Sequence, residues 1–162
     1  MLHSFLKTLI VTSAVAYGIF TSAEAEASAK GGIPAELVPL VNALKEAGYE
    51  VYMSKPPVNG AYGATNARQR KIWLAPISVE MGIARQVLIH EAVHAAQACP
   101  KGIYKPIGWE ITLPKNVEAT IKGILYRKYR RKDYAIEKEA FYMQNHPNAF
   151  TEISMALKDR CR

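Results

Sequence analysis

Apolar side chains recur at two different spacings along this chain, and the changes in spacing divide it into elements. Leucine and valine positions over residues 34–48 follow the helical repeat, so this stretch predicts a helix that begins at Pro34 and ends at Gly48. Residues 49–54 and 71–74 are short, mostly apolar runs closed by prolines, which is typical of strands. Residues 58–70 contain glycine and asparagine and predict a loop or an irregular hairpin connection.

The second half of the chain predicts helices almost throughout. A long apolar stretch over residues 79–99 predicts a buried helix, with Ser78 as its N-terminal cap. Residues 101–114 are rich in glycine and proline and predict a loop. The order of elements indicates an α+β fold that is mostly helical, with a small sheet of short strands packed on the long helix. Two or three more helices are expected after the loop, over about residues 115–129, 133–145 and 148–160.

The N-terminal residues have the pattern of a secretory signal peptide. Lys7 supplies a positive charge, residues 8–20 are apolar and uncharged, and small residues over 23–29 offer cleavage sites. We therefore expect residues 1–25 to be a signal peptide. Cleavage as late as residue 29 and an uncleaved membrane anchor are the alternatives. Residues 33–162 would then form one exported domain, periplasmic or secreted.

The chain has two cysteines, Cys99 and Cys161, and both lie in the expected exported domain. An even pair in an oxidising compartment favours one disulfide. This bond would tie the end of the long helix to the C-terminus and stabilise the fold by about 4 kcal/mol through loss of loop entropy in the unfolded chain. Two unrelated buried thiols are the alternative.

The formal net charge is +7, and much of the excess is concentrated in one basic run over residues 122–132. Two tyrosines interrupt this run, a pattern that in a cytoplasmic protein would indicate nucleic-acid binding. Export argues against a nucleic-acid partner. We expect a solvated helix face, with weak contact to an anionic membrane or cell-wall surface as the alternative.

His90, Glu91 and His94 form the pattern His-Glu-x-x-His within the long predicted helix. Residues four apart lie on one helix face, so the two imidazoles can converge on one point and supply half of a tetrahedral zinc site. Glu91 lies about 100° around the helix from His90, where it can reach a water bound to that metal. The spacing therefore predicts Zn²⁺ bound by the two histidines, with Glu91 as general base.

A catalytic zinc site needs a third protein ligand. The downstream glycine and histidine of the metzincins are absent, because Gln97 and Pro100 occupy those positions. The remaining candidates are two carboxylates on a later predicted helix, Glu137 and Glu139. Only one of them can face the metal, because two positions differ by about 200° on a helix. The other glutamate would then lie on a solvated helix face. His146, beside a proline at a helix end, is a weaker candidate.

The sequence resembles the gluzincins, in which His-Glu-x-x-His is followed on a later helix by a ligand glutamate with a small residue three positions on. Glu137 and Ala140 match that spacing, so the resemblance favours Glu137 as the third ligand and leaves Glu139 as the alternative. The nearest resemblance is to minimal, single-domain bacterial metallopeptidases. It implies a zinc-bound water, Glu91 as base, and an extended peptide or protein substrate lying along an edge strand, for which residues 71–74 are the candidate. An ordinary sheet strand without substrate is the alternative for residues 71–74.

The resemblance leaves several alternatives open. The domain could bind zinc without catalysis, or it could be an amidase that acts on cell-wall peptides with the same water chemistry. The retained Glu91 favours the peptidase, because a purely structural site does not need that carboxylate. Transition-state stabilisation usually needs a donor beside the metal, and Tyr134 would lie near the site if Glu137 binds. The aromatic candidates for this role are Tyr104, Trp109, Tyr126, Tyr134 and Tyr142.

Overall fold

The computed structural model describes residues 32–162, so the expected signal peptide lies outside the described residues. The predicted α+β class is confirmed, with a three-stranded sheet among helices. The strands are β1 (Glu50–Met53), β2 (Gly63–Asn66) and β3 (Lys71–Leu74). The helical elements are η1 (Ala35–Leu37), α2 (Val38–Glu46), α3 (Pro76–Glu80), α4 (Ala84–Ala98), α5 (Lys115–Lys128), η2 (Arg131–Asp133), α6 (Tyr134–Met143) and α7 (Ala149–Arg160).

The sheet has the strand order β1-β3-β2, with β1 parallel and β2 antiparallel to β3. The expectation that Lys71–Leu74 is an edge strand open to substrate is therefore wrong, because β3 is paired on both sides. The strand β2 lies in the segment that predicts a loop. Its sequence, Gly-Ala-Thr-Asn, contains only one residue type favoured in strands, so pairing with β3 decides its conformation.

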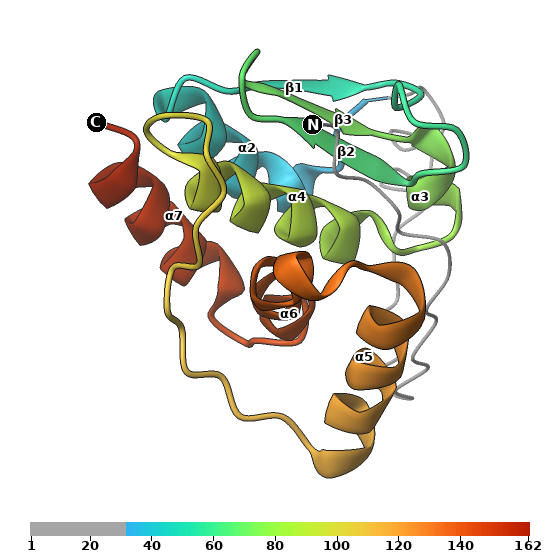
Figure 1. The fold of residues 1–162 in the computed structure, drawn as a ribbon. Helices are drawn as coiled ribbons and strands as arrows, with labels where there is room; N and C mark the ends of the chain where they lie inside the picture. Colours follow the sequence, from blue (N-terminus) through green and yellow to red (C-terminus); the bar gives the residue numbers. More distant parts are fainter. Residues whose placement is uncertain (1–31) are drawn as a thin grey trace.

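Helix α4 lies in the middle of the molecule, between the sheet and the C-terminal helices (Figure 1). One side of it packs against β2 and β3, and the other against α6 and α7. Every residue from Val87 to Ala98 is buried, which explains why the sequence is apolar on all faces. The polar groups of α4 are thus placed in the core, where they need partners.

The predicted helix over residues 79–99 is two helices. Helix α3 ends at Glu80, and Gly82 turns the chain with a φ of 68° before α4 begins. This left-handed backbone favours glycine, which has no Cβ to clash. Ser78 does not cap the long helix as expected. It lies buried inside α3, and its hydroxyl donates to the carbonyl oxygen of Ala75 at 2.6 Å.

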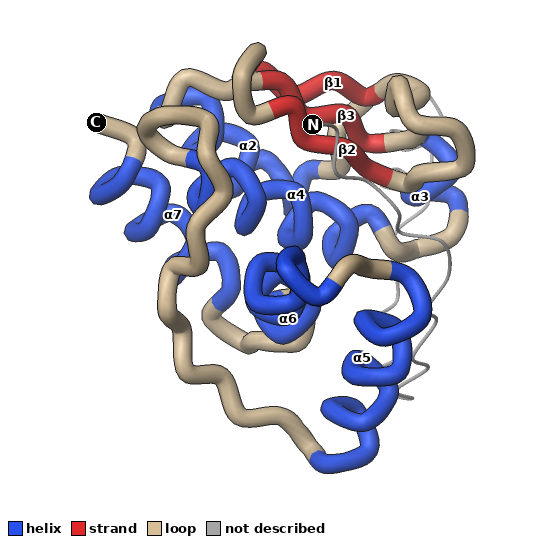
Figure 2. Tube along the Cα trace, in the orientation of Figure 1, coloured by secondary structure: helices blue, strands red, loops and turns tan. Residues whose placement is uncertain are grey.

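The predicted disulfide between Cys99 and Cys161 is confirmed, and it joins the end of α4 to the end of α7 across a separation of 62 residues. Residues 101–114 contain no helix or strand, as predicted, and connect α4 to α5 along one side of the molecule (Figure 2). None of the helices between residues 32 and 162 combines the length and apolar character that a membrane crossing requires.

The basic run lies at the surface of α5 and η2. All of its lysine and arginine side chains are exposed. Lys122 pairs with Glu118 one turn earlier at 3.1 Å, an exposed pair of the kind that contributes little to stability. These exposed side chains match the solvated helix face that the sequence predicts.

Candidate metal centre

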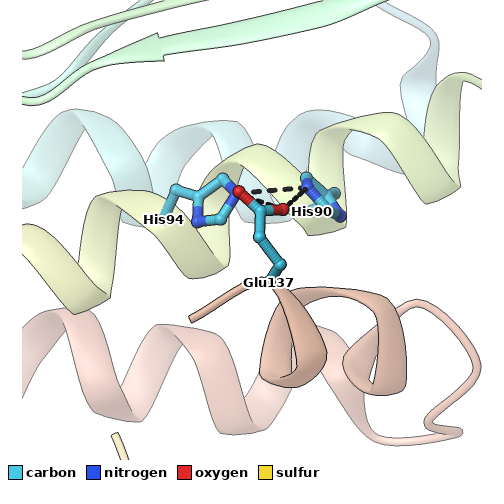
Figure 3. A group of neighbouring side chains, drawn as sticks. All are labelled: His90, His94 and Glu137. Carbon is cyan, nitrogen blue, oxygen red and sulfur yellow. Dashed lines mark hydrogen bonds and ion pairs between the residues drawn. The ribbon is translucent and has the colours of Figure 1, made fainter. Parts of the chain in front are cut away.

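Two histidines of α4 and one glutamate of α6 meet in the interior (Figure 3). His90 and His94 lie one turn apart, and their Nε2 atoms are 3.1 Å from each other. Oε2 of Glu137 lies 3.3 Å from Nε2 of His90 and 3.5 Å from Nε2 of His94. One ligand atom from each residue lies within 4.8 Å of the other two, so the group could hold a metal ion.

The packing of α6 against α4 brings the glutamate to the histidines. Glu137 is in the first turn of α6, and Ala140, three residues later, is fully buried. A small side chain at this position allows the two helices to approach closely. The ring of Phe141 then packs edge-on against His90, with 4.9 Å between ring centroids.

The cluster is closed to solvent and has unsatisfied polar atoms. His90, His94 and Glu137 are 3%, 2% and 1% exposed. Oε2 of Glu137 and Nδ1 of His90 have no hydrogen-bond partner among the described residues. A buried carboxylate oxygen that contacts two imidazole nitrogens but makes no hydrogen bond is costly, and a cation bound by the three ligand atoms would satisfy it. The residues at this site therefore fit a metal ion.

The charges of these groups depend on one another. Burial alone would raise the pKa of Glu137, but the imidazoles of His94 and His90 outweigh it and hold that pKa well below its usual range. Burial also disfavours the charged form of His94, but Glu137 and Glu91 raise the pKa of His94 to about 9. The site thus stabilises positive charge beside Glu137, which is the charge a metal ion would supply.

Glu91 lies on the side of α4 that faces strand β2. The hydroxyl of Thr65 is 2.8 Å from Oε2 of Glu91 and donates to it. Gly63 approaches the same side chain so closely that a Cβ there would lie 2.8 Å from Cγ of Glu91. Burial raises the pKa of Glu91, although His90 and His94 act in the opposite direction. An oriented, buried carboxylate with a raised pKa is suited to accept a proton.

Glu139, the alternative ligand, lies outside the cluster. Its carboxylate accepts hydrogen bonds from the side chain of Gln97 and from the backbone N–H groups of Ile107 and Gly108. It is also buried, so the expectation that the second glutamate lies on a solvated helix face is wrong. His146 is not part of the cluster either, and its ring nitrogen accepts a backbone hydrogen bond at the start of α7.

Two tyrosines contact the cluster. Tyr104, in the loop after α4, lies edge-on to His94 with 5.9 Å between ring centroids. Tyr129, which follows α5, hydrogen-bonds Glu137 and packs against Phe141. Burial raises the pKa of both hydroxyls, so both stay protonated and can donate.

The other aromatic candidates have different positions. Tyr134 packs against the smaller apolar cluster between α5 and α6, and Trp109 packs against the main core. Tyr126 is 77% exposed. Tyr142 donates to Glu118 at 3.0 Å. The tyrosine that hydrogen-bonds Glu137 is therefore Tyr129, whereas the sequence predicts Tyr134 near the site.

Four residues of the site are not among those that the sequence predicts. Gly63 and Thr65 belong to β2, which has the composition of a loop. Gln97 is three residues beyond His94, a spacing that brings side chains together on a helix and could have indicated the contact. Tyr129 lies within the basic run, where its role depends on how α5 and α6 pack.

Comparison with protein families, characterised proteins and solved structures gives no match to this chain. The chemistry of the site is therefore inferred from its own residues.

Proposed function

We propose that this chain is an exported zinc-dependent peptidase, in which Glu91 is the general base for attack of water on a peptide bond. The main support is that His90, His94 and Glu137 converge on one point. Glu91 is close enough to both histidines for them to lower its pKa, against the increase that burial causes. Two imidazoles and one carboxylate form the ligand set of a known class of catalytic zinc sites, which keeps a fourth position for water or substrate. The disulfide supports export.

The residues around the ligands suit this chemistry. A zinc ion at this site would supply a polarised water and a Lewis acid for the substrate carbonyl. Glu91 accepts a proton on its carboxylate and returns it to the leaving amine nitrogen. The hydroxyl of Thr65 holds the carboxylate of Glu91 in place. The raised pKa of Glu91 lets this carboxylate keep the proton between the two steps.

Zinc content and hydrolysis, measured on the same variants, test the proposal. The wild-type protein should bind one zinc per chain and generate new amine termini in an unfolded protein substrate. Glu91→Gln should keep the zinc and lose cleavage by about 100-fold or more. Glu137→Ala should lower zinc content more than Glu139→Ala does, because Glu139 lies outside the ligand cluster.

Two results would contradict the proposal. A wild-type protein that binds no zinc removes the metal site. Full cleavage by Glu91→Gln removes Glu91 as the base.

A non-catalytic zinc-binding domain is the second candidate, and the burial of all three ligands favours it. In that case zinc would act only on stability, by about 2.7 kcal/mol when its free concentration is 100 times the dissociation constant. The two candidates differ in one result. If the protein is a peptidase, the wild type cleaves the substrate and Glu91→Gln does not. If it is a non-catalytic domain, neither protein cleaves it.

A further inference from the structure

A series of hydrogen bonds connects the second nitrogen of His94 to Ile136 and Glu139 of α6. Nδ1 of His94 is 2.8 Å from Oε1 of Gln97. Nε2 of Gln97 donates to the carbonyl oxygen of Ile136 at 2.8 Å and to Oε2 of Glu139 at 2.9 Å. Gln97 is completely buried, so these contacts are not exchanged for water.

The donors and acceptors in this series of hydrogen bonds can be arranged in only one way. A carbonyl and a carboxylate both accept, so the atom of Gln97 that faces Ile136 and Glu139 must be its NH₂ group. Oε1 of Gln97 then faces His94, and Nδ1 of His94 must carry the hydrogen. In the neutral ring this leaves the lone pair on Nε2, directed at the cluster, which is the form that binds a metal.

The other histidine has no such support. Nδ1 of His90 is buried without a hydrogen-bond partner among the described residues. Of the two imidazoles, His94 is therefore the one whose Nδ1 hydrogen is fixed by a partner in the fold, so that Nε2 is the nitrogen left to bind a metal. Glu139, which bonds Gln97, also holds the loop after α4. Its carboxylate accepts hydrogen bonds from the N–H groups of Ile107 at 2.8 Å and Gly108 at 2.6 Å.

We propose that Gln97 and Glu139 are positioning residues of the metal site. Glu139, with the carbonyl oxygen of Ile136, fixes the amide of Gln97, and Gln97 fixes His94 with its lone pair toward the metal. This inference rests on the proposed metal site but not on catalysis. Partners of this kind typically change metal affinity by about 10- to 100-fold when they are removed.

Gln97→Leu tests the proposal, because it removes the acceptor and keeps an apolar side chain of similar size. Zinc affinity, measured by competition with a chelator, should fall about tenfold or more. By NMR, the wild-type protein should show a slowly exchanging proton on Nδ1 of His94, with or without zinc, and Gln97→Leu should lose its protection. Gln144→Leu is the matched control, since Gln144 makes a hydrogen bond to Gln86 outside the site.

Exchanging the amide of Gln97 and the carboxylate of Glu139 distinguishes a hydrogen-bonding role of these side chains from a packing role. Gln97→Glu alone places a carboxylate against Glu139 and should weaken zinc binding. In the double variant Q97E/E139Q the two groups exchange roles. The carboxylate at position 97 accepts from Nδ1 of His94, and the carboxamide at position 139 donates to that carboxylate. Zinc affinity and the protected Nδ1 proton should both recover in part relative to Q97E. Recovery is incomplete because the carbonyl oxygen of Ile136 loses its donor and the N–H of Ile107 loses its acceptor.

Two results would overturn the proposal. One is that Gln97→Leu matches Gln144→Leu within twofold in zinc affinity and keeps the protected proton. The other is that Q97E/E139Q shows no recovery over Q97E, and this comparison stands even if Gln97→Leu does not fold. A wild-type protein that binds no zinc contradicts the proposed function, whereas the Nδ1 proton of the metal-free protein still decides whether Gln97 positions His94.

Discussion

Replacing Gly63 with alanine should destabilise this protein, although it reduces the conformational freedom of the unfolded chain. A Cβ at this position would lie 2.6 Å from Cγ1 of Val87, 2.8 Å from Cγ of Glu91 and 2.9 Å from its Oε1. All three atoms belong to α4, which packs against helices on its opposite side and cannot move away freely. Overpacking of this kind costs about 1–3 kcal/mol. For a domain of this size that is a fall in Tm of about 3–15 °C.

Gly123→Ala is the control with the same chemical change. Gly123 lies within α5, where the nearest atom to a new Cβ is Nη2 of Arg127 at 3.8 Å. Alanine should therefore stabilise this helix by about 0.5–1 kcal/mol. Thermal unfolding of both variants at one zinc concentration should give shifts of opposite sign. If Gly63→Ala were as stable as the wild type, strand β2 could not approach α4 as closely as described.

Three other changes test the surroundings of the site. Thr65→Val removes a hydrogen bond that lowers the pKa of Glu91, so the acidic limb of the kcat/KM profile should move to higher pH, and an unmoved limb would contradict this role. Tyr129→Phe keeps the ring but loses the hydrogen bond to Glu137, so zinc affinity in chelator competition should fall about tenfold, and unchanged affinity would exclude the contact. Replacing both cysteines with serine removes a cross-link between residues 62 positions apart and should lower the free energy of unfolding by about 4 kcal/mol. The urea midpoint should fall, and an unchanged midpoint would refute this contribution of the disulfide.

The helices could be predicted because their patterns are local. In α2, Leu40, Val41 and Leu44 repeat at helical spacing and are buried, as the pattern indicates. The break between α3 and α4 could not be predicted in the same way, because Val79 and Ile83 continue the helical spacing across it. A single glycine with a positive φ ends the first helix there, and glycine also occurs within helices, as in α5.

Strand β2 could not be predicted because its residues are selected by contacts with other elements. Gly63 is required by the approach to α4, and Thr65 by the carboxylate that it contacts. Neither requirement is visible in local composition, which is that of a loop. Strand β2 forms instead because it pairs with β3, from which it is separated by four residues.

The sequence predicted the three residues that the structure brings together, with Glu137 preferred through the resemblance, but it could not exclude Glu139. Helical geometry shows that only one of them can face the metal, and the expectation for the other was a solvated face. Both are buried, because α6 has protein on two sides: α4 on one and the loop after α4 on the other. The polar partners that account for the burial of Glu139 are the side chain of Gln97 and the N–H groups of Ile107 and Gly108.

The burial of the site limits how it could act on a peptide. A substrate can reach the ligands only if an element moves, and α4 is held by the sheet, by two helices and by the disulfide at its end. The loop over residues 101–114 has no regular structure and lies against His94 through Tyr104. If this loop opens, Glu139 loses its two backbone donors but keeps Gln97. Because the carbonyl oxygen of Ile136 also holds the amide of Gln97, the metal-binding form of His94 would survive the opening.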